Sequence, residues 1–370
     1  MNFCVVGPIY PFRGGIAQHT TLLCRHLAEK HAVESVSFKR LYPSILFPGK
    51  TQMDSSTNIS APDSARIIDS INPLSWIEAG DHIRDMRPDC VLVQWWHPFF
   101  APCIASTLSR ARPAKTVFIC HNVIPHEGHS ITKPLSLWAL KKGDAFIVHA
   151  GEEKEALEKL IPGRPVERSF LPEFSVFPKR GMTKQEAKTA LKLDGKTILF
   201  FGLVRKYKGL MDLIQAMAML KDTGITCMIV GEFYDQKEKY LAEIEKHGLN
   251  GAFRIVDSYV PNEEVEQYFA AADAVVLPYI SATQSAVVQV AHIFERPAIA
   301  TAVGGIPEAV DNGRTGLIVP PQNPKALAGA IRRYYSEDME SRFVQSIQSD
   351  HGRFSWDRVI QTIESLGASI

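Results

Sequence analysis

Several features that identify common classes of protein are missing from this sequence of 370 residues. It contains no run of about 18 apolar residues, so no segment is expected to span a membrane. The first residues, MNFCVVGPIYPF, lack the charged start and the long apolar stretch of a signal peptide. We therefore expect a cytoplasmic protein.

Other binding signatures are missing as well. The six cysteines form no CxxC pair and no Cys/His cluster with zinc spacing, so they are expected to be reduced and buried. The formal net charge of +1 lacks the basic excess that is typical of nucleic-acid-binding proteins, and no nucleic-acid partner is expected. Neither half contains GxGxxG, which argues against a dehydrogenase.

What is present is an alternation of short apolar runs and amphipathic segments. Continuous apolar strands separated by helices are typical of parallel sheets covered on both faces, so the sequence predicts an α/β protein. The expected strands are 2–6, 33–39, 90–95, 116–120, 145–149, 197–202, 226–231, 253–257, 273–278, 298–301 and 316–319. The expected helices are 15–29, 73–86, 99–110, 132–142, 152–160, 183–191, 208–221, 235–247, 262–271, 285–295, 323–335, 338–349 and 355–368.

This pattern occurs twice along a chain that is longer than one core usually supports, so two doubly wound domains are expected. Prolines in 171–180 interrupt the periodicity and mark the junction. We expect a first domain of residues 1–173, completed by a C-terminal helix over 356–370, and a second domain of residues 174–355. Segment 40–62 is predicted to be a long loop that is either functional or mobile.

Candidate ligand sites follow two of the expected strands. Gly14 and Gly15 expose backbone N–H groups at a helix start, where an anion is favoured, although a tight turn alone would also need glycines. Beyond Gly202, three cations lie at a strand's carboxyl end, where α/β folds bind ligands: Arg205, Lys206 and Lys208. Such cations suit a diphosphate, and the alternative is a solvated loop.

A third candidate is segment 278–310, which combines hydroxyl side chains with a glycine turn. Ser281, Thr283 and Ser285 are good N-caps for the helix that follows, whose free N–H groups are expected to face a ligand. Glu308 follows in GGIPE. The alternatives are plain capping and a first-turn acid that stabilises a helix.

The fourth candidate is CHNVIPHEGH, residues 120–129. His121 and Asn122 follow a strand of the first domain and are expected to face a cleft between the domains. A lone histidine is more often structural than catalytic, but its place at a strand end favours a function.

Taken together, these segments resemble family 4 of the retaining glycosyltransferases, which have the GT-B fold of two Rossmann-like domains. The resemblance covers most of the chain. It rests on Gly14–Gly15, FGLVRKYKG at 201–209, IVG at 229–231, DAVVLPY at 273–279, RPAIATAVGGIPE at 296–308 and NGRTGLIVPPQNPKALAGAI at 312–331.

The resemblance implies transfer of a sugar from a nucleotide sugar to a glycan, lipid-linked or small-molecule acceptor. No apolar strand ends in a DxD motif, so neither a metal nor another cofactor is expected. His121, Arg205 and Lys208 would be catalytic, with the histidine beside the transferred sugar. The donor would be bound by Gly14, Gly15, Asn122, Gly202, Gly231, Glu232, Tyr259, Thr283, Gln284, Ser285, Ala286, Gln289 and Glu308.

The sequence departs from the family pattern at the sugar and ribose contacts. Members usually carry a Glu-x7-Glu pair, and its two positions are Ala282 and Val290 here. The Arg that often follows the strand-end glycine is Leu203. The ATQS segment marks a subgroup, and the candidates to replace the carboxylates in part are Thr283, Gln284 and Gln289.

The first domain is expected to bind the acceptor, through WWHPFF at 95–100 and loop 40–62, although these aromatics also suit core packing. Trp138 with neighbouring lysines in 133–143 suits either weak peripheral contact with an anionic membrane or a solvated helix face. Two other functions stay open. The missing carboxylates suit a non-catalytic nucleotide-sugar or glycan-binding relative, and the fold also suits a sugar-nucleotide epimerase.

Overall fold

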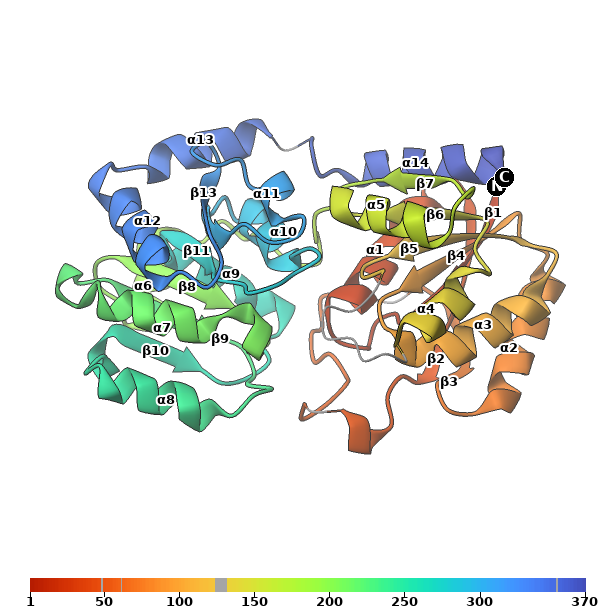
Figure 1. Ribbon diagram of the computed structural model, residues 1–370, viewed down its shortest axis with the longest axis horizontal. Helices are drawn as coiled ribbons and strands as arrows, with labels where there is room; N and C mark the ends of the chain where they lie inside the picture. Colours follow the sequence, from red (N-terminus) through yellow and green to blue (C-terminus); the bar gives the residue numbers. More distant parts are fainter. Residues whose placement is uncertain (48, 61, 124–131, 351) are drawn as a thin grey trace. The chain divides into compact units, whose positions relative to one another are not determined.

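The computed structural model describes residues 1–47, 49–60, 62–123, 132–350 and 352–370, so residues 124–129 of the CHNVIPHEGH segment lie outside the description. The chain divides into two compact units. The amino-terminal unit is Met1–Pro172 with Phe354–Ile370, and the carboxy-terminal unit is Glu173–Arg353. In each unit, helices lie against both faces of one sheet (Figure 1).

The amino-terminal unit contains a parallel sheet in the order β3-β2-β1-β4-β5-β6-β7. Its strands are β1 (Asn2–Val6), β2 (Ala32–Arg40), β3 (Ser64–Asp69), β4 (Cys90–Trp95), β5 (Lys115–Cys120), β6 (Ala145–Val148) and β7 (Val166–Arg168). The helices and short 3-10 turns are α1 (Gly15–Ala28), η1 (Ser44–Leu46), α2 (Pro73–Met86), η2 (Pro98–Phe100), α3 (Ala101–Ala111), α4 (Thr132–Leu140), α5 (Gly151–Leu160) and α14 (Trp356–Ser369).

The carboxy-terminal unit contains a second parallel sheet in the order β10-β9-β8-β11-β12-β13. Its strands are β8 (Thr197–Phe201), β9 (Thr226–Val230), β10 (Phe253–Val256), β11 (Ala274–Leu277), β12 (Ala298–Thr301) and β13 (Gly316–Val319). Its helical segments include α6 (Lys184–Leu191), η3 (Lys206–Lys208), α7 (Leu210–Ala218), α8 (Lys237–Lys246), α9 (Asn262–Ala271), α10 (Ala286–Ile293), α11 (Ile306–Ala309), α12 (Pro324–Ser336) and α13 (Glu340–Ser349).

Both sheets have the same winding. In each, the chain adds strands outward on one side and then returns to add strands on the other, so the order reverses between β1 and β4 and between β8 and β11. Doubly wound folds bind ligands at the carboxyl ends of the strands beside this reversal. The expected fold of two Rossmann-like α/β domains is confirmed. The topology predicts ligand binding at the carboxyl ends of β1, β4, β8 and β11.

The elements that the sequence failed to predict are short or lie at a sheet edge. Strand β3 has only one buried residue, and β7 has three residues, so neither forms a continuous apolar run. The helix expected over 208–221 begins only at Leu210, because η3 ends in Gly209 with a left-handed φ of 69°. The four-residue helix α11 was also missed.

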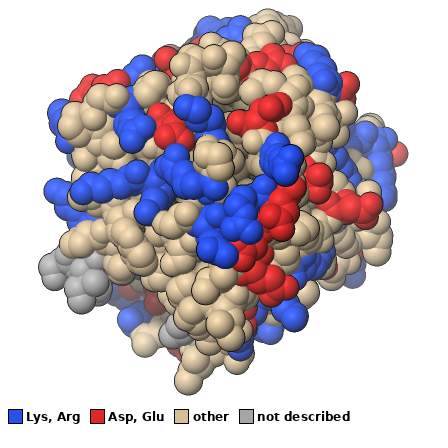
Figure 2. Space-filling view, turned by 90° about the vertical axis from the view of Figure 1, so that its right-hand side faces the viewer, with Lys and Arg blue, Asp and Glu red and all other residues tan. Residues whose placement is uncertain are grey.

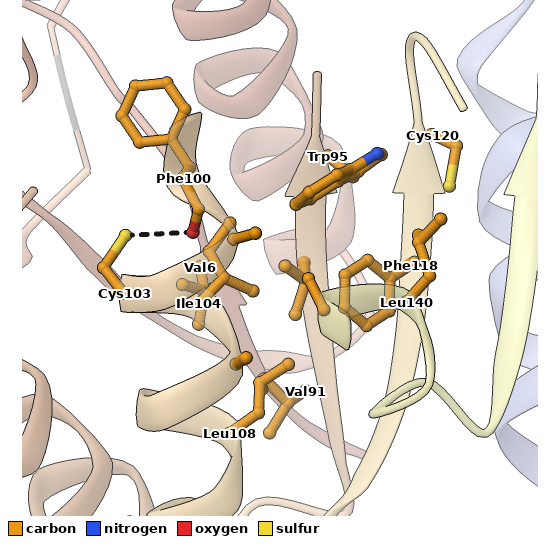
Figure 3. Packing of buried hydrophobic residues seen from close by; sticks show 14 of the residues in the cluster. Val6, Val91, Trp95, Phe100, Cys103, Ile104, Leu108, Phe118, Cys120 and Leu140 are labelled. Carbon is orange, nitrogen blue, oxygen red and sulfur yellow. Dashed lines mark hydrogen bonds between the residues drawn. The ribbon is translucent and has the colours of Figure 1, made fainter. Parts of the chain in front are cut away.

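The core of the amino-terminal unit lies between the central strands and the helices that cover them (Figure 3). Trp95 and Phe118 pack edge to face, and the Cys103 thiol donates to the Phe100 carbonyl oxygen over 3.2 Å. All six cysteines are free and buried, as expected. Burial raises the pKa of the Cys103 thiol to about 12, so it packs as a small apolar group.

None of the helices in the described ranges is long and apolar enough to cross a membrane. On the face of the molecule shown in Figure 2, basic side chains stand beside acidic ones. Within the amino-terminal unit, Asp81 pairs with Arg84 and Arg110, and Asp144 lies within 3.4 Å of Arg112 and Arg164. Positive charge is thus balanced locally.

Candidate functional site

Lys208 is a buried cation at the carboxyl end of β8. Gly202, with a φ of 94°, directly follows this strand, and a Cβ added there would lie 3.0 Å from the Lys208 Nζ atom. Only 8% of the lysine is exposed. Burial, together with the positive charge of Arg205, lowers the Lys208 pKa to about 8, so the side chain is a cation at neutral pH.

Aromatic rings, rather than carboxylates, neighbour the two predicted cations. Lys208 Nζ lies 5.5 Å from the centre of the Tyr279 ring, and the Arg205 guanidinium carbon lies 5.1 Å from that of Tyr234. Neither cation forms an ion pair with a carboxylate in the part of the chain that the structure describes. An electron-rich ring attracts a cation without neutralising it, so both charges remain available to an anion.

The start of α10 lies beside the end of β8. The Val287 Cγ2 atom is 3.7 Å from the position that a Cβ at Gly202 would take. Ser285 is the N-cap residue, but its hydroxyl makes no capping hydrogen bond and instead approaches the Tyr279 hydroxyl at 3.4 Å. The prediction that Ser285 caps this helix through its side chain is therefore wrong. The helix start, from Ala286 onward, keeps its capacity to bind an anion.

Glycines let two further turns approach their neighbours closely. At Gly304, with φ of 50°, a Cβ would lie 1.9 Å from the carbonyl oxygen of Ala282. At Gly231, which directly follows β9, a Cβ would lie 2.2 Å from the carbonyl oxygen of Gly202. Any side chain at either position would push the backbones apart, so these glycines fix the shape of the site.

The two positions that usually carry glutamates are buried. Ala282 and Val290 are 7% and 3% exposed, and neither offers a polar side-chain atom. Gln289, in the first turn of α10, is 2% exposed, and its Oε1 atom has no hydrogen-bond partner among the described residues. A buried acceptor without a partner is uncommon in native proteins. Gln289 is therefore the strongest candidate of the proposed replacements, ahead of the half-buried Gln284 and the buried Thr283.

The remaining predicted residues of this unit follow other strands of the same sheet. Glu232 is buried just after β9, and Tyr259 is half-buried beyond β10. Glu308 lies half-buried in the first turn of α11, where an acid is favourable. Its carbonyl oxygen accepts a hydrogen bond of 2.6 Å from the Arg353 guanidinium. These residues lie on the carboxyl side of the sheet, but at separate strands.

In the amino-terminal unit, Gly14 is the N-cap residue of α1 and has a φ of 103°. A Cβ there would meet nothing within 4 Å, so the position needs glycine for its backbone conformation and not for close packing. Gly15 begins the helix, and no side chain caps this end. The start of α1 therefore keeps backbone N–H groups that no side chain caps, and their binding of an anion stays a prediction.

The described part of segment 40–62 packs on this turn. The Arg13 N–H donates to the Gln52 carbonyl oxygen over 2.9 Å, and the Asp54 N–H donates to the Pro11 carbonyl oxygen over 2.8 Å. Phe12 and Met53 form an isolated β-bridge. Residues 52–54 of the long segment are therefore joined by hydrogen bonds to the turn after β1.

The aromatic run 95–100 forms a packed cluster. Trp95 and Phe100 are fully buried, and the rings of Trp96 and Phe100 are 4.3 Å apart. The Trp96 indole N–H donates to the Tyr42 hydroxyl over 3.2 Å. The core-packing interpretation therefore holds for Trp95 and Phe100, while Trp96 and Phe99 are half-buried.

His121 directly follows β5 and is buried. Its Nε2–H donates to the Gln94 Oε1 atom over 2.6 Å. Burial and two neighbouring histidines, His19 and His149, hold its pKa well below the usual range, so the ring is neutral at pH 7. Beside it, the Asn122 amide donates to the Trp96 carbonyl oxygen over 3.4 Å.

Three titratable residues of this edge were missed by sequence reasoning. His19 and His149 belong to no local motif, and their approach to His121 joins parts of the chain that are far apart. Glu153 accepts a hydrogen bond of 2.6 Å from the Val123 N–H, and burial raises its pKa to about 7. The only signal in the sequence was that His149 ends an apolar run, as His121 does.

Two family models match successive parts of the chain. Residues 13–168 match "Glycosyltransferase Family 4", and residues 195–337 match "Glycosyl transferases group 1". The first match lies in the amino-terminal unit and the second in the carboxy-terminal unit.

Curated relatives with similar sequences carry glycosyltransferase names. D-inositol 3-phosphate glycosyltransferase of Corynebacterium urealyticum is 28% identical over 226 residues, which cover 59% of this chain and 52% of the relative. TuaC of Bacillus subtilis, named for a role in teichuronic acid biosynthesis, is 30% identical over 268 residues, 69% of this chain and 64% of the relative. The chain thus spans about half the length of the D-inositol 3-phosphate glycosyltransferases that it matches.

Solved structures match over the whole chain. Sucrose-phosphate synthase of Thermosynechococcus elongatus has a TM-score of 0.79 at 17% identity, and HepE of Anabaena in complex with UDP has 0.77 at 15%. Both chains are covered completely in each comparison. At these identities, the likeness shows the fold alone. Joined to the two domain models, it shows that the chain belongs to the glycosyltransferases of the GT-B fold.

Proposed function

We propose that the protein is a retaining glycosyltransferase that moves a sugar from a nucleoside-diphosphate sugar to a hydroxyl group of a glycan, lipid-linked or small-molecule acceptor. One observation carries the proposal. Lys208 is a buried cation without a carboxylate partner among the described residues, next to the strand-end Gly202 and the start of α10. A cation beside backbone donors suits a diphosphate.

Arg205 and Lys208 would neutralise the diphosphate as it leaves. The N–H groups at Ser285 and Ala286 would add hydrogen bonds, since no side chain caps α10. Because these groups are fixed before the reaction, they would stabilise the developing negative charge without reorganising. A divalent cation on the diphosphate is then unnecessary, and we propose metal-independent transfer.

The other parts of the donor would be held by residues at the neighbouring strand ends. The base would lie near Gly231, Glu232 and Tyr259. The sugar and ribose would be held by Thr283, Gln284, Gln289 and Glu308, with Gln289 supplying the buried polar atom that replaces a carboxylate. Further donor contacts are proposed for Gly14, Gly15 and Asn122.

In the proposed step, the bond between the anomeric carbon and the phosphate oxygen breaks, and the acceptor oxygen bonds to that carbon on the same face. A phosphate oxygen of the leaving group takes the acceptor's proton, so no protein nucleophile is required. His121 would lie beside the transferred sugar as a neutral ring, because its pKa lies too low for it to carry a proton at pH 7.

The comparisons support the class of donor and acceptor. HepE of Anabaena was solved with UDP and with UDP-glucose, which are a nucleotide and a nucleotide sugar. The relatives' names mention D-inositol 3-phosphate and teichuronic acid biosynthesis. Six buried, unpaired cysteines suit a reducing compartment such as the cytoplasm. Trp138 on α4 is exposed, so weak contact of this helix with a membrane stays a prediction.

One observation favours a second function, a nucleotide-sugar-binding protein without turnover. The buried Ala282 and Val290 remove two carboxylates that family members usually place near the sugar and ribose. Such a protein would keep the phosphate contacts of Lys208 and lose the chemistry.

The test begins with thermal unfolding in the presence of UDP, GDP, ADP, CDP and dTDP, each with and without EDTA. A nucleotide at 100 times its dissociation constant should stabilise the fold by about 2.7 kcal/mol. The corresponding nucleotide sugar is then incubated with candidate acceptors, and NMR of the product reports the anomeric configuration. Stabilisation by one nucleotide and a product of retained configuration are expected. Binding without any product would support the second function, and no stabilisation at all would overturn the donor site.

A further inference from the structure

Three histidines that are far apart in the sequence meet at the carboxyl edge of the amino-terminal sheet. His19 lies on α1, His121 directly follows β5, and His149 directly follows β6. One ring nitrogen from each of them lies within 4.8 Å of the other two, and all three side chains are buried. The ring centres of His19 and His121 are 4.7 Å apart, and those of His121 and His149 are 5.2 Å apart.

Two of the rings make a hydrogen bond to a residue outside the cluster, called here the outer partner, and this bond determines which ring nitrogen is protonated. His149 Nδ1 lies 2.8 Å from the Ser169 carbonyl oxygen, which can only accept, so Nδ1 carries the proton. His121 Nε2 donates to Gln94 Oε1 in the same way. In each ring the other nitrogen is then the one with the lone pair. Metal-binding histidines typically show this arrangement, with one ring N–H held by a carbonyl or amide oxygen.

His19 has no such outer partner. Neither of its ring nitrogens finds a hydrogen-bond partner among the described residues, although the ring is completely buried. Gln94 lies close enough to favour protonation of His19, but its own Nε2 atom also lacks a partner within the described chain, so the two do not reach hydrogen-bonding geometry. A buried imidazole in an ordinary core would have at least one of these bonds.

An aromatic ring closes one side of the cluster. Trp356 of α14 lies against His19, with ring centres 5.1 Å apart, and covers that side of the cluster.

We propose that His19, His121 and His149 bind one divalent transition-metal ion, with zinc as the best fit. Three imidazoles form a known zinc ligand set that leaves a fourth position for water or a substrate oxygen. With Zn–N distances of about 2.0–2.1 Å, the nitrogens would stand about 3.4 Å apart in tetrahedral geometry, so the rings close slightly on binding. This proposal departs from the prediction of a metal-free chain. That prediction rested on motifs of neighbouring residues, whereas these three histidines are far apart in the sequence.

The ion would belong to the amino-terminal unit, whereas Arg205 and Lys208 belong to the carboxy-terminal unit. The proposal uses only residues of the amino-terminal unit, and it does not depend on sugar transfer. The ion would fix the positions of α1 and of the residues after β5 and β6. It would also set the orientation of His121.

The experiment uses the full chain without an affinity tag. The protein is treated with a chelator, incubated with one to five equivalents of ZnCl2 and desalted, and its zinc content is measured by mass spectrometry. One zinc ion per chain is expected to remain. Cobalt(II) in place of zinc should give the visible absorption bands of a tetrahedral site with nitrogen ligands. A wild-type protein that keeps no zinc and gives no such bands would overturn the proposal.

Variants separate this site from adventitious binding. His19→Ala should weaken zinc binding by more than about 100-fold, and Gln94→Leu, which removes an outer partner, by about 10-fold to 100-fold. His26→Ala is the matched control, because His26 lies on the same helix and stacks on the same Trp356 outside the cluster. It should bind zinc like the wild type. If His19→Ala does not fold, His19→Gln replaces it. Unchanged zinc affinity in the folded His19 variant contradicts the proposal.

Discussion

The two sheets of this chain share one winding, but their carboxyl edges carry different chemistry. In the amino-terminal unit, the buried polar groups near the end of β5 include three neutral imidazoles. In the carboxy-terminal unit, the buried polar groups near the end of β8 include the Lys208 cation, with Arg205 nearby. The same topology therefore supports two kinds of site. What decides between them is the residue type that follows each strand and how deeply the fold buries it.

The contrast also extends to how each edge is held. The carboxy-terminal edge depends on glycines whose backbones touch neighbouring backbones, at Gly209, Gly231 and Gly304. At Gly14 in the amino-terminal unit, a side chain would meet nothing within 4 Å. The cationic edge is thus shaped by close backbone packing. The start of α1 instead needs an unusual backbone angle.

The largest expected effect comes from removing the buried cation. Lys208→Ala should lower kcat by about 100-fold or more, because a preorganised charge on the leaving group is lost. Steady-state kinetics with the nucleotide sugar found in the binding panel would measure this. Lys206→Ala is the matched control, since Lys206 lies in the same 3-10 turn but is exposed, and its kcat should stay within about twofold of the wild type. Equal losses in both variants would contradict a special role for Lys208.

A smaller effect should follow from filling the space at Gly209. A Cβ there would lie 1.8 Å from the Pro278 carbonyl oxygen, so Gly209→Ala should destabilise the fold by about 2–3 kcal/mol through clash and backbone strain. Gly224→Ala is the control, because its φ of 67° nearly equals the 69° of Gly209 and its Cβ would meet nothing within 4 Å. It should cost about 1 kcal/mol. Urea unfolding measures both. Similar losses would show that backbone angle, and not close packing, shapes this edge.

The smallest expected effect is a change of nucleotide affinity with pH. It should come from Lys208 at the carboxy-terminal edge and not from the histidines at the amino-terminal edge. Burial lowers the pKa of Lys208 from 10.5 to about 8, so the cation is present below pH 8 and is lost as the pH rises through that value. Nucleotide affinity should therefore fall above pH 8, approaching about tenfold per pH unit. Because the unfolded lysine holds its proton up to its ordinary pKa, the stability of the free protein should rise between pH 8 and 10.5 as the affinity falls.

Calorimetric titration from pH 6.5 to 9.5 would measure the affinity, and the Lys208→Arg variant is the control because arginine keeps its charge. Its pH profile should be flat. The histidine cluster should contribute nothing in this range, since burial keeps its rings neutral. A wild-type profile as flat as that of Lys208→Arg would contradict Lys208 as the nucleotide's counter-charge.

Much of the fold followed from local pattern. Continuous apolar runs predicted most of the strands because strands buried on both faces are apolar, while β3 and β7 were missed because β3 has only one buried residue and β7 has only three residues. The proposed phosphate site could be suggested from the sequence because Arg205 and Lys208 come within a few residues of the end of β8, and strand ends are where this topology binds ligands. In both cases the information lies within a few residues.

The sequence by itself determined the two doubly wound units, the glycine turns and the group of cations after β8. Only the tertiary structure decided which cation is buried. Lys206 and Lys208 are both lysines of η3, but Lys206 is exposed and Lys208 is buried. The tertiary structure also decided that the Ser285 hydroxyl leaves the start of α10 uncapped, and that His19, His121 and His149 meet. The physical reason is the distance along the chain over which each property is determined. Periodicity and strand ends are local properties of the chain, whereas burial and convergence depend on the order in which distant strands pair.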